Sequence, residues 1–331
     1  MNAPIRVGIV GYGNLGRGVE TAIGLNPDLR LVGVFTRRDP QSVTPVHAST
    51  RVFPMGDLDQ DREDLDVLIL CGGSRDDLPE QSPALAARFS LVDSYDNHAR
   101  IPEHFDAVDA AARTAGTTAI ISTGWDPGLF SLNRLFGEAI LPQGRTYTFW
   151  GRGLSQGHSD ALRRVPGVAG GVQYTIPSEQ AIASVRAGED PELSTRERHG
   201  RECYVVLEDG ADAAAVRAEI VTMPDYFEPY DTEVHFITAE QLATEHQGMP
   251  HGGFVIRSGR TSQESQGSGQ VIEYRLDLDS NPEFTSSVLV AYARATARLN
   301  RAGDHGAKTV FDVPPGLLSP RSAAELRADL L

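Results

Sequence analysis

The sequence predicts an α/β protein with an N-terminal Rossmann-type doubly wound parallel sheet and a second, α+β domain built around a mixed sheet. Three observations support this prediction. Short apolar strands alternate with helical segments over the first 125 residues, a glycine-rich turn follows the first strand, and longer, half-polar strands begin near residue 145. With 331 residues the chain is long enough for two domains of the usual size, about 100 to 200 residues each.

The N-terminal strands are short and apolar on both faces. They are expected at residues 5–10, 29–35, 66–71, 89–94 and 117–122. Between most of them lie segments with helical periodicity, at residues 15–24, 79–89 and 102–116. Strands that bury both faces and are joined by helices form a parallel sheet that is covered on both sides.

The glycine-rich turn GYGNLG follows the first strand and precedes the first helix. In this position it fits the dinucleotide-binding fingerprint, in which Gly11 permits the tight turn, Gly13 lets the backbone approach a pyrophosphate and Gly16 lets helix and strand pack closely. Backbone N–H groups at the helix start then receive the phosphate charge. The alternative is a glycine turn that binds nothing. The fingerprint assigns these residues to a nucleotide: Gly11, Tyr12, Gly13, Asn14, Leu15 and Gly16.

The end of the second strand indicates which nucleotide is bound. Proteins that bind NAD place an acid there for the ribose 2′-hydroxyl, whereas this chain has Thr36, Arg37 and Arg38. A threonine hydroxyl and two guanidiniums can bind a 2′-phosphate, which an acid would repel. The sequence therefore predicts NADP, and the alternative is that both arginines are solvated surface residues.

Ligands of open parallel sheets bind beyond the carboxyl ends of the strands. After the third strand, CGGS offers a second glycine loop, in which Cys71 is a packing residue and no nucleophile. In the loops after the third and fourth strands, we expect these residues to bind the cofactor: Cys71, Gly72, Gly73, Ser74, Asp93, Ser94 and Tyr95.

Two acids, Asp96 and Asp126, follow the fourth and fifth strands. Carboxylates there can hold a substrate ammonium and accept its proton, which hydride removal from an amine carbon requires. We expect both to be catalytic. For Asp126, which precedes a proline, helix capping is an equally weighted and compatible alternative.

The second domain is predicted from half-polar strands at residues 145–151, 171–176, 202–208, 232–238, 252–259 and 270–279. A helix at 282–303 and the segment 309–318 are expected to return to the first domain. The boundaries are therefore 1–124 with 283–331 for the NADP-binding domain, and 125–282 for the second. In the loops of the cleft, Trp125 and Trp150 can wall an apolar chain, and Arg201 can clamp a carboxylate.

Composition narrows the class of protein. The net charge of −15 argues against nucleic acid or an anionic membrane as a partner. Two cysteines are too few for a disulfide framework, and the spacing of His246 and His251 matches no metal motif, so no metal is expected. Without a signal-peptide pattern at the start, a cytoplasmic location is expected.

When these segments are considered together, the chain resembles the NADP-dependent meso-diaminopimelate D-dehydrogenases over nearly its whole length. The motifs that carry the resemblance are VGYGNLGRGVE, VDSYDNH, STGWDPGLFS, TFWGRGLSQGHSDALRRVPGV, QYTIPSE, TMPDYF, GMPHGG and LDLDSNPEFT. Two departures are small: CGGS differs from the family form by one residue, and Arg152 replaces a proline.

The resemblance implies a homodimer whose second domain binds substrate and forms the dimer. It implies reversible oxidative deamination of meso-2,6-diaminopimelate at its D centre, giving L-2-amino-6-oxopimelate, which cyclises to tetrahydrodipicolinate, with ammonia and NADPH. Asp96 then binds the D-end amine, with Asp126 beside the reacting carbon. It further implies that the substrate is contacted by these residues: Trp125, Trp150, Ser155, Gln156, Gly157, Thr175, Arg201, His251 and Asn281.

Other functions remain open on the residues alone. Another NADP-dependent D-amino-acid dehydrogenase and a dihydrodipicolinate-type reductase have the same architecture. A non-catalytic NADP-sensing regulator is a more distant alternative, because it leaves the acids and indoles near the cleft unexplained.

Overall fold

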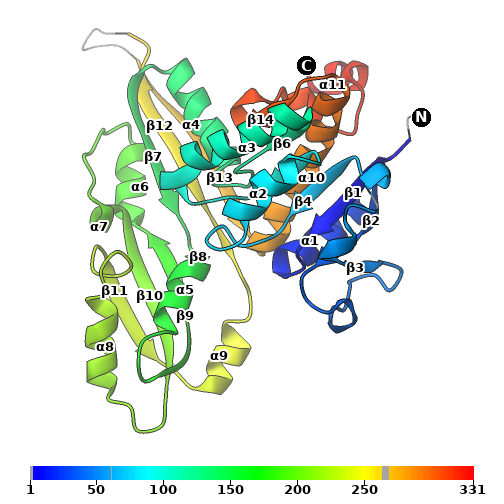
Figure 1. The fold of residues 1–331 in the computed structure, drawn as a ribbon. Helices are drawn as coiled ribbons and strands as arrows, with labels where there is room; N and C mark the ends of the chain where they lie inside the picture. Colours follow the sequence, from blue (N-terminus) through cyan, green and yellow to red (C-terminus); the bar gives the residue numbers. More distant parts are fainter. Residues whose placement is uncertain (1–2, 61, 263–267) are drawn as a thin grey trace. The chain divides into compact units, whose positions relative to one another are not determined.

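The computed structural model describes residues 3–60, 62–262 and 268–331 (Figure 1). These residues form two compact units, Met1–Leu132 with Pro282–Leu331, and Asn133–Asn281. The first unit is therefore built from both ends of the chain. Within the described ranges, no helix is long and apolar enough to cross a membrane.

The first unit contains a parallel sheet with the strand order β14-β6-β5-β4-β1-β2-β3. The five predicted strands are confirmed. Two others, β3 and β14, were not predicted, and each is three residues long. The strands are β1 (Ile5–Val10), β2 (Leu29–Thr36), β3 (Val52–Pro54), β4 (Val67–Leu70), β5 (Leu91–Asp93), β6 (Thr118–Ile120) and β14 (Gly306–Lys308).

Both faces of this sheet are buried, as the apolar strands predicted. In β4, Ile69 packs in a cluster with residues of α1 and α10, whereas Leu68 and Leu70 pack with residues of α2 and α3. Alternate side chains thus serve opposite faces. The helices are α1 (Asn14–Gly24), α2 (Leu78–Ala86), α3 (Ile101–Ala115), α10 (Asn281–Arg301) and α11 (Ala323–Leu330), with the first turn of α4 (Leu129–Ile140).

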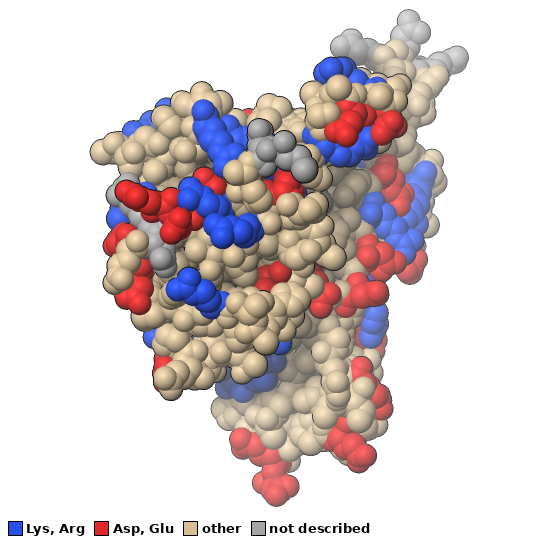
Figure 2. Space-filling view, turned by 90° about the vertical axis from the view of Figure 1, so that its right-hand side faces the viewer, with Lys and Arg blue, Asp and Glu red and all other residues tan. Residues whose placement is uncertain are grey.

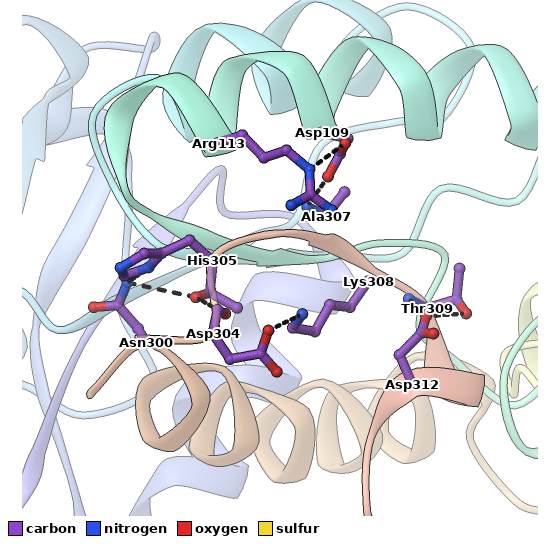
Figure 3. Close-up of polar contacts among 10 residues, drawn as sticks. Asp109, Arg113, Asn300, Asp304, His305, Ala307, Lys308, Thr309 and Asp312 are labelled. Atoms are coloured by element: carbon purple, nitrogen blue, oxygen red, sulfur yellow. Dashed lines mark hydrogen bonds and ion pairs between the residues drawn. The ribbon is translucent and has the colours of Figure 1, made fainter. Parts of the chain in front are cut away.

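Polar contacts hold the short edge strand β14 in place (Figure 3). The Asp109 carboxylate on α3 accepts a hydrogen bond from the Ala307 N–H at 2.8 Å and pairs with Arg113 at 2.7 Å. Lys308 pairs with Asp304 at 2.6 Å on the chain leading into the strand. These side chains come from segments far apart in the sequence, which explains why no local pattern predicts the strand.

The second unit contains two sheets. One, with the order β11-β10-β9-β8, is mixed, because β10 pairs with β11 in parallel and with β9 antiparallel. The other, β13-β12-β7, is antiparallel. The strands are β7 (Gln143–Trp150), β8 (Gly153–Leu154), β9 (Val168–Pro177), β10 (His199–Leu207), β11 (Asp231–Phe236), β12 (His251–Arg260) and β13 (Gly269–Leu278).

Helices cover these two sheets. Leu162 of α5 and Ile220 of α8 pack against Cys203 and Val205 of β10, and Ile182 of α6 packs against Ile256 of β12. The α+β class with a mixed sheet is confirmed. The helices of this unit are α5 (Gln156–Leu162), α6 (Glu179–Arg186), α7 (Thr195–Arg198), α8 (Ala213–Val221) and α9 (Ala239–Glu245).

Arg294 on α10 ties the C-terminal segment to the start of the chain. Its guanidinium binds both carboxylate oxygens of Asp28, at 2.6 and 2.8 Å, and also donates to the Leu318 carbonyl at 2.7 Å. The Arg294 side chain is 2% exposed. Hydrogen bonding to Arg294 lowers the pKa of Asp28 below its ordinary value of 3.8.

We expect Arg294→Met to lower the free energy of unfolding by about 3 kcal/mol, because it leaves a partly buried carboxylate without its partner. The pair stabilises the fold fully above the ordinary aspartate pKa, and that stability is lost as the pH falls through the lowered folded value. Urea unfolding followed by circular dichroism should therefore give a difference in the free energy of unfolding between the wild type and Arg294→Met that is constant from pH 7 to about pH 4. This difference should shrink in stronger acid. Arg217→Met in the second unit is the control, since among the described residues Arg217 donates to the Val234 carbonyl and forms no ion pair with an acid. An equal loss in both variants would contradict this role.

Candidate active site

The turn before α1 has the geometry expected of its three glycines. Gly11 has a φ of +86°, and a Cβ built on Gly16 would lie 2.5 Å from the Gly11 carbonyl oxygen. A Cβ on Gly13 would meet nothing within 4 Å. The turn thus leaves open space beside Gly13, at the helix N-terminus, where partial positive charge favours an anion.

A cavity of about 250 Å³ lies at this turn, at the carboxyl ends of β1, β2 and β4. It brings together the first glycines, the arginines and the CGGS loop, as the sequence predicts. Five further lining residues were not predicted: Val10, Phe35, Met55, Asp77 and Gln81. The predicted residues that line it are Gly11, Tyr12, Gly13, Thr36, Arg37, Arg38, Cys71 and Gly72.

The two guanidiniums at this cavity have partners on different segments. Arg37, with a side chain that is 67% exposed, forms an ion pair with Asp77, and Arg38 donates to the Tyr12 carbonyl. The Thr36 hydroxyl oxygen accepts a hydrogen bond from the Arg38 N–H at 3.1 Å. Asp39, the nearest acid along the chain, instead accepts from the Gln41 N–H. An anion at the rim therefore meets two arginines and the Asp77 carboxylate.

Asp77 is an acid that the sequence analysis missed. Its second carboxylate oxygen accepts a hydrogen bond from the Gly73 N–H at 2.9 Å, which fixes the loop after β4. It lies 40 residues from Arg37 in the sequence, so no local signal relates the two residues.

Cys71 lines the cavity, but its chemistry is that of a packing residue. Burial raises the pKa of its thiol well above the ordinary range. The thiolate that a nucleophile requires is therefore disfavoured, in agreement with the prediction of no catalytic role.

Asp93 has a different position from the one expected of a cofactor ligand. Its side chain has no exposed surface, and its carboxylate accepts hydrogen bonds from the Ser82 hydroxyl at 2.6 Å and from the N–H groups of Tyr95 and Ser122 at 3.1 and 2.9 Å. His104 lies 2.8 Å away on the same carboxylate. The carboxylate thus joins the loops after β5 and β6 and does not reach the cavity surface, because the fold already uses its oxygens.

The loop after β5 presents Asp96 to solvent. The Ser74 hydroxyl oxygen accepts from the Asp96 N–H at 3.1 Å, and the hydroxyl donates to the Ser94 carbonyl at 3.4 Å. The Tyr95 ring points inward, 2% exposed, and stacks on His104 at 4.1 Å. Ser74 therefore sets the position of the exposed Asp96 carboxylate.

Asp126 lies in the loop after β6 and is half-buried. The helix α4 begins at Leu129, so Pro127 is not its first residue, and Asp126 lies three residues before the helix. A Cβ on Gly128 would overlap the Gly124 carbonyl, so this tight loop requires glycine there. Because β5 and β6 are neighbours, the loops of Asp96 and Asp126 leave the same edge of the sheet. Trp125 is 7% exposed and packs edge-on against Phe130.

The second unit holds a buried cation. Arg201 on β10 is 6% exposed, donates to the Thr175 hydroxyl on β9 and lies 3.7 Å from the Tyr230 ring centre. Its Nε atom has no hydrogen-bond partner, and no ion pair joins Arg201 to an acid among the residues that the structure describes. Burial lowers the Arg201 pKa, but a guanidinium stays charged at neutral pH. This charge lacks a counter-ion.

Trp150 at the end of β7 is held by His199. The backbone N–H of Trp150 donates to His199 Nε2 at 2.8 Å, and the two rings stack with their centres 5.3 Å apart. Burial, with a smaller effect of the Arg201 charge, lowers the pKa of His199 to about 4. His199 is therefore neutral at pH 7 and can accept this hydrogen bond.

The remaining predicted substrate residues also lie in the second unit. Gly153 of β8 pairs with Thr175, and a Cβ on Gly153 would lie 2.5 Å from the His251 ring. His251 therefore lies next to the strand pair that carries Thr175. The loop of Ser155, Gln156 and Gly157 begins α5, with the Ser155 hydroxyl 2.9 Å from His158. Asn281 begins α10, and its N–H donates to the Met249 carbonyl at 2.9 Å.

Metal and nucleic-acid sites are not indicated. No group of three or more His, Cys, Asp or Glu side chains that could hold a metal ion occurs in the part of the chain covered by the structure. On the face drawn in Figure 2, acidic and basic side chains are interspersed, and the residues described there form no continuous basic surface.

Comparison with known proteins relates these features to a family. Residues 124–280 match the family model for the diaminopimelic acid dehydrogenase C-terminal domain. The chain is 63% identical to the meso-diaminopimelate D-dehydrogenase of Ureibacillus thermosphaericus over 99% of both chains. The structure of the C. glutamicum DAP dehydrogenase in complex with DAP is 48% identical, with a TM-score of 0.91 over 100% of both chains. An engineered D-amino acid dehydrogenase bound to NADP+ is 47% identical, with a TM-score of 0.86, over 99% of this chain and 100% of that one.

These similarities extend over both units and are far above the level at which only a fold is shared. The chain belongs to the family of meso-diaminopimelate D-dehydrogenases.

Proposed function

We propose that this protein catalyses the NADP-dependent, reversible oxidative deamination of meso-2,6-diaminopimelate at its D centre. The products are L-2-amino-6-oxopimelate, which cyclises to tetrahydrodipicolinate, ammonia and NADPH. The observation that carries the proposal is the buried Arg201 without a counter-ion, in a chain whose relatives are named for this substrate. A substrate with a second carboxylate, distant from its reacting carbon, supplies the missing charge.

NADP fits the residues of the first unit. The open space at Gly13 suits a pyrophosphate, and Thr36, Arg37 and Arg38 suit a 2′-phosphate. The loop residues Gly72, Gly73, Ser74, Ser94 and Tyr95 would hold the nicotinamide end, with Asp93 as a positioning residue behind them. When bound, NADP supplies the hydride acceptor.

Asp96 and Asp126 act on the amine. Only a neutral amine can give up hydride from its carbon, so the substrate ammonium must first lose a proton. The exposed Asp96 carboxylate binds the ammonium and accepts this proton, and Asp126 assists water when it adds to the imine. Trp125 and Trp150 limit the access of bulk water.

The distal L-amino-acid end belongs to the second unit. Arg201 and Thr175 bind its carboxylate, and His251, Asn281 and the loop 155–157 bind the rest of this end. Selection of the D centre follows, because the end that fits these residues is the one that does not react. The free thiols of Cys71 and Cys203 fit a reducing compartment, and we place the enzyme in the cytoplasm.

A substrate comparison tests the function. We expect NADP reduction, followed by the absorbance of NADPH, with meso-diaminopimelate and none with the L,L isomer, which has no D centre. The D,D isomer and D-lysine should react more slowly, because the first presents the wrong distal configuration and the second lacks a distal carboxylate. NAD should give a kcat/KM at least about 10-fold lower than NADP. Absence of turnover with every amino acid would favour an NADP-sensing regulator.

Replacement of Asp96 tests the proton acceptor. Asp96→Ala should lower kcat by about 100- to 10,000-fold, the usual contribution of a general base, while the Kd of NADPH, measured by fluorescence, stays unchanged. Asp106→Ala, which removes an exposed carboxylate on the neighbouring α3, is the matched control. Unchanged turnover of Asp96→Ala would rule out this assignment.

We also propose a homodimer formed through the second unit. On α4 of this unit, Phe136 and Ile140 are 50% and 65% exposed, and the edge strand β13 carries the exposed Val271 and Ile272. Apolar residues on an edge strand and a helix are typical of a subunit interface. Analytical ultracentrifugation should show a dimer for the wild type and a monomer for Phe136→Asp. Leu25→Asp, at an exposed apolar residue of the first unit, should stay dimeric, and a monomeric wild type would contradict the proposal.

A further inference from the structure

Gln173, in the middle of β9, is a buried polar side chain that nothing in the fold satisfies. It has no exposed surface, and neither its amide oxygen nor its amide nitrogen has a hydrogen-bond partner among the described residues. Buried amides are nearly always hydrogen-bonded in folded proteins, because the lost contacts with water are costly. This exception requires an explanation.

The backbone of Gln173, by contrast, is fully used. Its N–H donates to the Ser159 hydroxyl at 3.0 Å, and its carbonyl accepts from the Ser155 N–H at 3.2 Å. These bonds hold the first turn of α5 and the loop 155–157 against β9. Gln173 is therefore fixed directly beneath the loop that we assign to the substrate.

The position of Gln173 in the sheet places it beside the buried cation. Gln173 pairs with Cys203, and two residues further along the same strands Thr175 pairs with Arg201. Because side chains alternate between the faces of a sheet, Gln173, Thr175 and Arg201 lie on one face as neighbours.

On this side of the sheet, two more buried polar atoms have no hydrogen-bond partner among the residues that the structure describes. They are the Nε atom of Arg201 and the Nε2 atom of His158, which is on α5. Burial, with the nearby charge of Arg201, lowers the pKa of His158 to about 4, so its ring is neutral. Three elements thus direct unsatisfied polar groups toward the region of Arg201, which is typical of a site that receives a polar ligand.

We propose that Gln173 is an unassigned specificity residue of the substrate site. Its carboxamide binds the distal amino-acid end of the substrate, directly or through one ordered water, next to Arg201. A carboxamide can donate to a carboxylate and accept from an ammonium, so it suits a zwitterionic group. This inference rests on the proposed function.

The alternative is that Gln173 only fills space in the sheet, and stability distinguishes the two roles. An unsatisfied amide destabilises the unliganded fold, so replacing it with methionine, a side chain of similar size, should leave the Tm unchanged or raise it. If Gln173 is retained for binding, its replacement should weaken substrate binding without lowering the stability of the fold.

The test is steady-state kinetics and thermal unfolding of Gln173→Met in the full-length enzyme. We expect the KM for meso-diaminopimelate to rise about 10-fold, as for one lost hydrogen bond to a charged group, with kcat within about 3-fold, the KM for NADP unchanged and the Tm unchanged or higher. Gln173→Glu places a carboxylate beside Arg201 and should raise this KM further, by about 100-fold. Tyr174→Phe is the matched control, since its side chain lies on the opposite face and bonds to His246.

Turnover of meso-diaminopimelate by the wild type is measured first, so that failure of the proposed function is separate from failure of this inference. An unchanged KM in Gln173→Met, or a lower Tm or loss of folding in that variant, would show that the side chain supports the sheet and would overturn the proposal.

Discussion

A buried charge is stable only when a partner compensates it, and the structure of this protein depends on that constraint. Asp93 meets that need within the first unit, where four groups surround its carboxylate and join the loops of the two proposed catalytic acids. Arg201 in the second unit is 6% exposed, and among the described residues its guanidinium contacts Thr175 and the Tyr230 ring. The satisfied charge supports the structure, and the unsatisfied charge is available to a ligand. Both had been predicted to touch a ligand, and only their partners distinguish their roles.

Much of the fold follows from the sequence because its signals are local. Strands apolar on both faces, such as β4, and half-polar strands, such as β10, show their burial in a few consecutive residues. The three glycines at the turn and the start of α1 have the predicted geometry for the same reason. The strand β14 was missed, since it depends on Asp109, about 200 residues away in the sequence. The proline after Asp126 does not mark the first helical residue, because α4 begins two residues later, at Leu129.

The predicted residues that line the cavity at the glycine turn lie where a loop follows a strand, whereas Asp77, which belongs to another segment of the chain, was missed. Asp77 lies in no quoted motif, and Gln173 begins the motif QYTIPSE without any local sign of its role, because the role of each depends on residues of another strand or loop. Asp77 also changes the argument about the cofactor. The acid that is missing after β2 is supplied by another segment, but it pairs with Arg37, so it weakens the attraction of this arginine for a phosphate without removing it.

The charge of the whole molecule makes these local arrangements necessary. A protein with a net charge of −15 repels a polyanionic cofactor at long range, whereas meso-diaminopimelate, with two ammonium and two carboxylate groups, carries no net charge. Salt screens that repulsion within about 10 Å, so a few well-placed cations decide binding at short range. In the binding mode that we propose, Arg37 and Arg38 supply these cations at the solvent-exposed rim, where water weakens each contact and two charges are needed. We propose that Arg201 acts alone, because burial strengthens its field. The residues around Arg201 leave it incompletely satisfied, so that a substrate carboxylate would gain by binding there.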